Sequence, residues 1–85
     1  LHASPLRVLC VDDNPDAVES LGMLLDMLGF RAQVCPDSET ALERFESFHP
    51  EVCILDLGLP RIGGCELAAR MREQAQNSGE DLYLI

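Results

Sequence analysis

The sequence predicts a doubly wound α/β fold, in which helices cover both faces of a parallel sheet. Short, nearly continuous apolar runs alternate along the chain with segments whose apolar residues recur every three or four positions. Two of the apolar runs end abruptly in acidic residues, and such runs are typical of strands covered on both faces. Because the chain has only 85 residues, it forms one domain at most, which we place at residues 6–85 after a short tail at residues 1–5.

The first strand is predicted over residues 6–11, and a helix starts after it at Asn14-Pro15. Asn14 can cap this helix, and Pro15 suits its first position because the missing N–H has no helical partner there. Gly29 is expected to end the helix in a left-handed conformation. The apolar residues of the helix lie at helical spacing and are expected to face the core: Val18, Leu21, Leu24, Leu25 and Leu28.

The remaining elements continue the alternation. A second strand is predicted over residues 30–35, near a sheet edge, and a second helix begins with Asp37 or Ser38 as its cap and ends at His49-Pro50. The third strand covers residues 52–55, and a loop rich in glycine and proline covers residues 57–64. Helical spacing resumes over residues 65–76, a polar connection spans 74–81, and a fourth strand starts at residue 82. Right-handed crossovers between these strands would make the sheet parallel.

The net charge of the chain limits the classes of partner that it is expected to bind. There are 15 acidic residues against 6 basic ones, all arginine, for a formal charge of -9. This balance argues against nucleic acid or an anionic membrane surface and fits a domain that binds cations or a basic partner. No apolar run approaches the roughly 20 residues that a membrane span needs, so we expect no membrane contact by this domain.

The residues that carry sulfur are interpreted as packing residues. The cysteines have no C-x-x-C spacing, and three of them lie in or beside apolar runs, so we expect reduced, buried thiols and a cytoplasmic location rather than a disulfide or zinc framework. These cysteines are Cys10, Cys35, Cys53 and Cys65. The methionines, which lie at core-like or flanking helical positions, are Met23, Met27 and Met71.

Three acids are expected at one edge of the sheet. Asp12 and Asp13 follow the first buried strand, and Asp56 follows the third. Ligands of open parallel sheets bind at the carboxyl ends of the strands, so these carboxylates would converge if the two strands are neighbours. Their mutual repulsion is relieved by a cation, and Mg²⁺ prefers such oxygen ligands. A simpler interpretation is that all three are solvated acids at strand ends.

Residues 8–14 (VLCVDDN) and 52–60 (VCILDLGLP), with Gly64 after them, resemble the receiver domain of two-component response regulators. The resemblance covers the whole chain. It implies a flavodoxin-like fold with strand order 2-1-3-4-5, of which this sequence carries the elements as far as the fourth strand. It also implies that Asp56 accepts a phosphoryl group from a phosphohistidine of a histidine kinase or a histidine phosphotransfer protein. The domain would catalyse its own phosphorylation and so switch its interaction surface, without being an enzyme that acts on a separate substrate.

The resemblance implies the metal ligands as well. Asp12, Asp13 and Asp56 would hold Mg²⁺ or Mn²⁺, with Asp13 as a direct ligand and Asp12 acting mostly through water. The backbone carbonyl of Gly58 would be a further ligand.

The resemblance also implies roles for residues in the loop after Asp56. Pro60 would stiffen this loop, or it is an ordinary turn proline, and Gly64 would support the loop. Gly63 stands where the family usually has an acid or an amide and is expected to be a weaker helix cap. The switch Ser or Thr and the Lys of the family are not found within this chain. The charged Arg61 lies near the acidic loop and could touch a phosphate or a partner.

The sequence stops inside its fourth strand, so we expect these residues to belong to a longer chain. Residues 13–21 resemble receivers that are fused to hybrid sensor histidine kinases, so a kinase of this kind is one expected parent. Alternatively, a second copy completes the sheet by edge pairing or exchange.

Other functions were weighed on the same residues. A pseudo-receiver would serve as an interaction module without phosphorylation. A phosphatase with an aspartate nucleophile would need its second acid where Gly58 stands. His49 as a phosphodonor is disfavoured, because it precedes Pro50 at a helix end.

Overall fold

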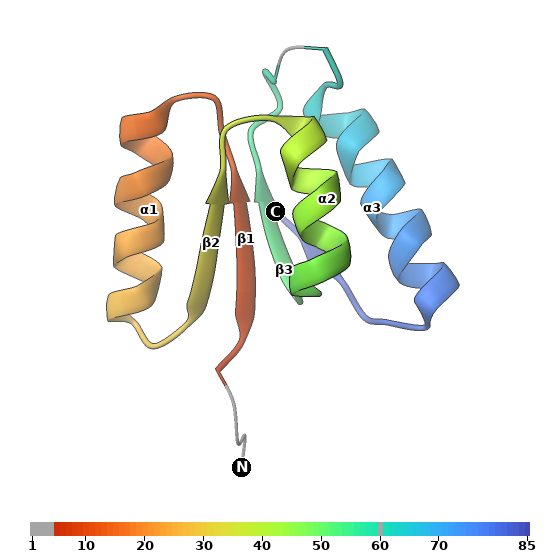
Figure 1. Cartoon of the computed structure of the whole chain (residues 1–85), viewed down its shortest axis with the longest axis horizontal. Coiled ribbons are helices and arrows are strands. Elements are labelled where there is room, and N and C mark those ends of the chain that lie inside the picture. The colour runs from red at the N-terminus through yellow and green to blue at the C-terminus, as the bar shows by residue number, and fades with distance from the viewer. Residues whose placement is uncertain (1–4, 60) are drawn as a thin grey trace.

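The computed structural model describes residues 5–59 and 61–85, so residues 1–4 of the expected tail lie outside the described residues. The elements along the chain are β1 (Arg7–Val11), α1 (Pro15–Met27), β2 (Arg31–Cys35), α2 (Ser38–Phe48), β3 (Val52–Leu55), α3 (Gly64–Ser78) and β4 (Tyr83–Leu84). All pairings between these strands are parallel, and the sheet has the order β2-β1-β3-β4 (Figure 1). The predicted fold and the predicted order of its first four strands are therefore confirmed, with β2 at the edge.

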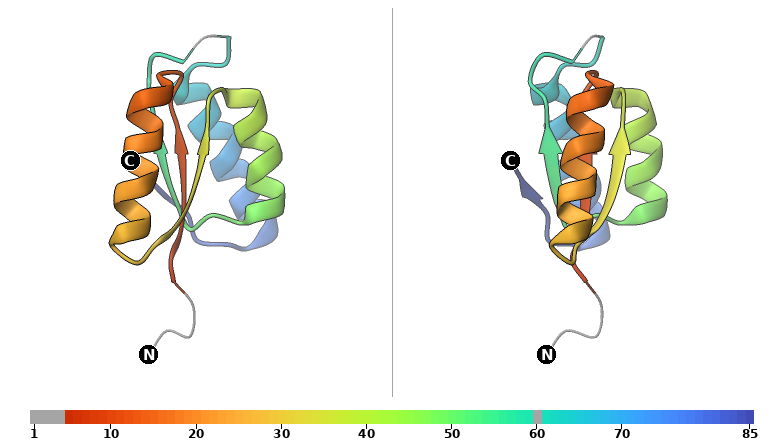
Figure 2. Two further views of the ribbon diagram at one scale, coloured as in Figure 1. Left: turned by 60° about the vertical axis from the view of Figure 1, so that its left-hand side comes forward. Right: turned by 90° about the vertical axis from the view of Figure 1, so that its left-hand side faces the viewer.

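Helices cover both faces of the sheet (Figure 2). Side chains of a strand alternate between the faces. Leu9 and Val11 of β1 therefore join a cluster with residues of α2 and α3, whereas Val8 and Cys10 pack with Val18 of α1 on the other face. As a result β1 is buried on both sides, as its continuous apolar run predicted.

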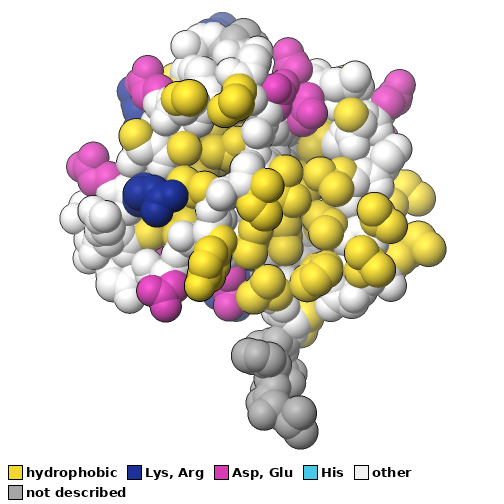
Figure 3. Space-filling model, turned by 180° about the vertical axis from the view of Figure 1, so that it is seen from behind, with side chains coloured by type: hydrophobic (Ala, Val, Ile, Leu, Met, Phe, Trp, Pro, Cys, Tyr) yellow, Lys and Arg dark blue, Asp and Glu magenta, His cyan; other side chains and the backbone are white. Residues whose placement is uncertain are grey.

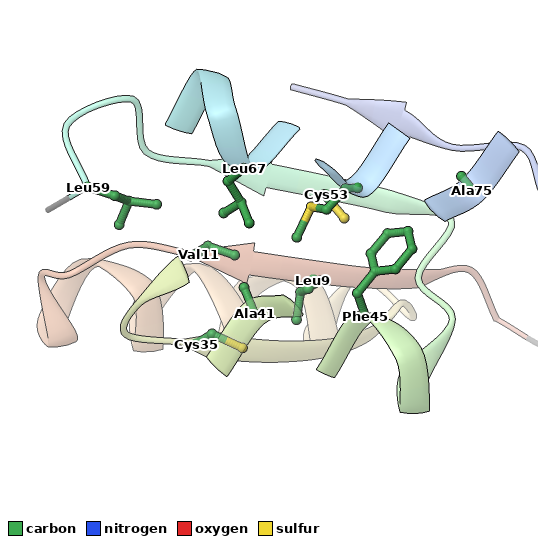
Figure 4. Packing of buried hydrophobic residues seen from close by; sticks show 10 residues of the cluster. Leu9, Val11, Cys35, Ala41, Phe45, Cys53, Leu59, Leu67 and Ala75 are labelled. Atoms are coloured by element: carbon green, nitrogen blue, oxygen red, sulfur yellow. The ribbon is translucent and has the colours of Figure 1, made fainter. Parts of the chain in front are cut away.

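The larger cluster lies between the sheet and the helix pair α2 and α3 (Figure 4). Two of its members, Cys35 and Cys53, are free thiols, and Cys10 is a free thiol on the opposite face. Burial raises the pKa of Cys53 to about 12 and that of Cys10 to about 11. These thiols therefore stay protonated and behave as small apolar side chains, which confirms the prediction. The prediction was wrong for Cys65 of α3, which is exposed.

The apolar stripe of α1 is wider than the surface it covers. Val18 is buried, and Leu21 and Leu25 pack against the sheet, as predicted. The prediction was wrong for Leu24 and Leu28 of the stripe and for the packing role of Met23 and Met27, because α2 and α3 lie on the other face and no described element covers the outer flank of α1. We call this flank the α1 ridge; it consists of Met23, Leu24, Met27 and Leu28, which are 51% to 82% exposed. Figure 3 shows hydrophobic side chains gathered on this side of the molecule.

The end of α3 also differs from the prediction. The helix continues to Ser78, two residues beyond the predicted end at residue 76, and takes up the start of the expected connection. Ala75 is buried, so it extends the apolar stripe by another turn, and Gly79 ends the helix with a φ of 69°. A glycine adopts this left-handed conformation without steric cost.

The starts of the helices follow the predictions. Asn14 accepts hydrogen bonds from the N–H groups of Asp16 and Ala17, and Asp37 accepts one from Thr40. Over the part of the chain that the structure describes, no helix is both long enough and apolar enough to cross a membrane.

Candidate functional site

The three predicted acids converge at the carboxyl edge of the sheet. Strands β1 and β3 are parallel neighbours in which Val11 pairs with Leu55, so the residues that follow them emerge side by side. One carboxylate oxygen from each of Asp12, Asp13 and Asp56 lies within 4.8 Å of the other two. Asp13 is exposed and the other two are half-buried. The predicted acidic cluster is therefore present.

The backbone of the sheet fixes two of these acids. The N–H of Asp12 donates to the carbonyl of Cys35 at 3.1 Å, and the N–H of Asp56 donates to the carbonyl of Val11 at 2.9 Å. Both bonds extend the strand pairing by one residue beyond β1 and β3. The Cα positions of Asp12 and Asp56 are thus set by the rigid sheet rather than by a loop.

Local hydrogen bonds orient the carboxylates. Asp12 Oδ1 accepts the N–H of Asn14 at 2.9 Å, and Asp56 Oδ1 accepts the N–H of Gly58 at 3.0 Å. Because an ionised carboxylate has about four acceptor sites, these bonds restrict side-chain rotation and leave capacity for a ligand.

The donor set of the cluster fits a hard cation. All three ligand atoms are carboxylate oxygens, which suit Mg²⁺, Ca²⁺ or Mn²⁺ better than softer metals. Three negative charges at this separation repel one another, and the attraction of each carboxylate to a divalent cation among them would offset that repulsion. The acidic triad can therefore bind a metal.

Gly64 brings the start of α3 against the backbone that follows Asp56. It is buried, and a Cβ at this position would lie 2.5 Å from the carbonyl oxygen of Asp56 and 2.7 Å from the Cα of Leu57. Gly63 precedes it as the N-cap and offers no side-chain hydrogen bond, as predicted. Pro60 lies outside the described residues.

Sequence reasoning missed the contacts that hold the segment between β3 and α3. Leu59 is 6% exposed and inserts into the larger core cluster. Ser38, predicted only as a possible cap, donates its hydroxyl to the carbonyl of Ile62 at 2.6 Å. Arg61 pairs with Glu39 at 2.8 Å. These partners are 22 and 24 residues apart, so no local pattern could have indicated them; only the apolar character of Leu59 was a signal.

His49 lies at the opposite end of the strands. It follows α2 in a left-handed conformation with a φ of 52° and precedes β3. Its Nδ1 lies 3.3 Å from Glu80 Oε2, and its carbonyl accepts a hydrogen bond from Arg7 Nε at 2.8 Å. Its place at the amino ends of the strands separates it from the acidic cluster.

Comparisons with known proteins agree with this architecture. The profile of the response regulator receiver domain matches residues 8–80. The transcriptional regulatory protein TrcR of Mycobacterium tuberculosis is 39% identical over 70 residues, which are 82% of this chain and 27% of TrcR. The sensor histidine kinase AtsR of Burkholderia thailandensis is 40% identical over 67 residues, which are 79% of this chain and 11% of AtsR. The chain thus spans about a quarter of the one relative and a ninth of the other.

Solved structures show the same fold. The response regulator TrrA of Thermotoga maritima, solved in complex with Mg²⁺ and BeF, is 33% identical with a TM-score of 0.78, covering 85% of this chain and 63% of TrrA. The receiver domain of Ssk1 from Saccharomyces cerevisiae, co-crystallised with the histidine phosphotransfer protein Ypd1, is 20% identical with a TM-score of 0.83, covering 95% of this chain and 61% of that one. With a match over residues 8–80 and an acidic cluster consistent with a phosphorylation site, this chain belongs to the response regulator receiver domain family of two-component signalling.

Proposed function

We propose that this chain is a phosphoacceptor in a phosphorelay, and that Asp56 takes its phosphoryl group from a phosphohistidine of a histidine kinase or a histidine phosphotransfer protein. One observation carries the proposal: the carboxylates of Asp12, Asp13 and Asp56 lie within 4.8 Å of one another at the end of two buried strands. Such a cluster combines a fixed nucleophile with a place for the cation that phosphoryl transfer uses.

Asp56 is the proposed nucleophile. A carboxylate oxygen of Asp56 attacks phosphorus, the N–P bond of the phosphohistidine breaks, and the imidazole nitrogen keeps the bonding electron pair. The bond from the Gly58 N–H to Asp56 Oδ1 holds the carboxylate in one rotation for this attack.

The metal at this site is proposed to be Mg²⁺, or Mn²⁺ in its place. Asp13 would bind it directly and Asp12 mostly through water, together with Asp56 and the backbone carbonyl of Gly58. A bound divalent ion supplies positive charge that offsets the charge on the transferring phosphoryl oxygens. The complex of TrrA with Mg²⁺ and BeF supports this choice of metal.

Gly64 and Pro60 are proposed to support the loop after the acceptor. The lack of a Cβ at Gly64 lets α3 begin against the backbone of Asp56. The ring of Pro60 would stiffen the chain between Asp56 and Gly64.

The proposed partner is a protein that carries a phosphohistidine, and phosphorylation would change the surface offered to further partners. The co-crystal of the Ssk1 receiver with Ypd1 supports this kind of partner. The buried free thiols suit the reducing conditions of the cytoplasm, where we place the domain. The larger size of TrcR and AtsR supports a longer parent chain, and the short β4 would also allow a homodimer by edge pairing or exchange.

Phosphorylation with acetyl phosphate and Mg²⁺, followed by intact-mass spectrometry, tests the proposal. We expect the unmutated protein to gain the mass of one phosphoryl group and Asp56→Asn to gain none. Asp81→Asn is the matched control, because it removes one exposed negative charge before β4 and should phosphorylate normally. An undiminished adduct on Asp56→Asn would refute the assignment of Asp56. A lack of any adduct or of Mg²⁺ binding by the unmutated protein would instead identify a pseudo-receiver.

A further inference from the structure

The described residues between Asp56 and α3, 57–59 and 61–63, are called the β3–α3 loop, and the first of them lies beside the first residue of α3. The first residue of the loop, Leu57, lies against the position of Gly64, where a Cβ would come within 2.7 Å of the Leu57 Cα. The loop carries Gly58, whose N–H bonds Asp56 Oδ1 at 3.0 Å. The loop therefore contributes one of the hydrogen bonds that orient the proposed nucleophile.

Two neighbouring residues of the loop bind two neighbouring residues of α2. The carbonyl of Ile62 accepts the Ser38 hydroxyl at 2.6 Å, and Arg61 Nη1 lies 2.8 Å from Glu39 Oε2. Both partners belong to the first turn of α2. The first turn of α2 is thus the point to which the second half of the loop is attached.

The two attachments differ in their surroundings. The Arg61 and Glu39 side chains are 81% and 43% exposed, so water and salt weaken this ion pair and it contributes little. Ser38 is fully buried at 0% exposure. Ile62 is partly buried, so water reaches this bond less easily than the exposed ion pair, and removal of the Ser38 hydroxyl takes a donor from the Ile62 carbonyl. The Ser38 bond is therefore the stronger of the two.

Ser38 is not needed to cap α2. Asp37 is the N-cap and accepts the N–H of Thr40 at 2.7 Å, which serves the helix start. The hydroxyl of Ser38 points across to the loop instead. A buried polar side chain without a role in its own helix suggests a role in the segment that it bonds.

We propose that Ser38 is a positioning residue for the acidic site. Its hydroxyl holds the β3–α3 loop on α2 and so keeps Gly58 in place beside Asp56, which lets the loop contribute to metal binding. This inference rests on the proposed function of the acidic cluster, but the attachment of the loop to α2 can be measured without any metal.

The test compares three variants of the ¹⁵N-labelled protein by NMR. Ser38→Ala removes the buried hydroxyl and leaves the Asp37 cap intact. Glu39→Gln is the matched control, because it removes the negative charge from the exposed attachment of the same loop to the same helical turn and so weakens it. Phe45→Leu controls for stability, because it removes core contacts further along α2, at the opposite end of the larger core cluster from Leu59 of the loop (Figure 4). The readouts are amide hydrogen exchange of the loop in metal-free protein and the Mg²⁺ dissociation constant from a titration.

For Ser38→Ala we expect loop exchange about fivefold faster and an Mg²⁺ dissociation constant about fivefold higher, as the loss of one part-buried hydrogen bond predicts. Glu39→Gln should change either quantity less than about twofold. Phe45→Leu should lower the melting temperature and leave the Mg²⁺ dissociation constant unchanged.

Unchanged loop exchange or Mg²⁺ binding in Ser38→Ala would overturn the inference, as would equally weakened Mg²⁺ binding in Phe45→Leu. A lack of Mg²⁺-dependent shifts in the unmutated protein would refute the proposed function itself. If the unmutated protein binds Mg²⁺ and Ser38→Ala changes neither loop exchange nor Mg²⁺ binding, only the role of Ser38 would be refuted.

Discussion

Gly64→Ala should destabilise the fold, although alanine is the better helix former. The new Cβ would lie 2.5 Å from the Asp56 carbonyl oxygen, 2.7 Å from the Leu57 Cα and 3.1 Å from the Asp56 carbonyl carbon. All three are backbone atoms at the end of β3, so no side-chain rotation can make room. Either α3 must move away from the sheet or the start of the β3–α3 loop must shift.

The size of the effect follows from two opposing contributions. Overpacking costs about 1–3 kcal/mol, and the three backbone contacts place this site near the upper value. Replacing glycine by alanine in a helix returns at most about 1 kcal/mol. The free energy of unfolding should therefore fall by about 2 kcal/mol, which for a domain of this size lowers the melting temperature by about 8–16 °C.

Urea unfolding followed by circular dichroism measures this change, and Gly63→Ala is the adjacent control. Gly63 is the N-cap with a φ of -67°, and a Cβ added to it would meet no heavy atom of the described residues within 4 Å, its chain neighbours aside. Its replacement should cost only about 0.5 kcal/mol through the poorer cap. Equal losses in the two variants, or a more stable Gly64→Ala, would refute the steric explanation.

Three further predictions concern a helix cap, a titrating carboxylate and the thiols. Asn14→Ala should lower the free energy of unfolding by about 1 kcal/mol in urea, because two N–H groups of α1 lose their acceptor; an unchanged midpoint would contradict the cap. The hydrogen bond from the Thr40 N–H lowers the pKa of Asp37, so its stabilising contribution is complete above the unfolded-state pKa of about 4 and is lost as the pH falls through the lower folded-state pKa. Asp37→Asn, which still caps α2, should therefore show a flatter loss of stability below about pH 4 in thermal unfolding. An aromatic disulfide reagent at pH 8 should label Cys65 rapidly and the three buried cysteines only after denaturation; rapid labelling of more than one thiol would contradict their burial.

The sequence predicted those parts of the fold that depend on nearby residues. Asn14-Pro15 and Asp37 mark their helix starts because a cap bonds N–H groups two or three positions away. The convergence of the acids was also predictable, because the order of buried strands places the ends of β1 and β3 at one edge. Gly64 was recognised by its motif, but the reason for a glycine there is visible only in its contact with the Asp56 backbone.

The parts that could not be predicted depend on distant residues or on which elements pack on each face of the sheet. The hydroxyl of Ser38 and the carbonyl of Ile62 come together only when α2 and α3 pack on the same face. Helical spacing places Leu24 on the apolar stripe of α1, but it does not reveal that no described element covers this flank of the helix, where Leu24 meets solvent. The end of α3 depends on whether Gly79 adopts a left-handed conformation, and the polar residues before it gave the opposite indication.

The exposure of the α1 ridge also makes its two methionines easier to oxidise than the third. Met23 and Met27 are 66% and 82% exposed, whereas Met71 is 0% exposed inside the core. A mild peroxide treatment should therefore convert the two ridge thioethers to sulfoxides first, which peptide mass mapping would show. Each sulfoxide is polar, so oxidation would make the outer flank of α1 hydrophilic while the packing beneath it stays intact. Oxidative damage to this domain would thus begin as a change of surface character rather than as unfolding.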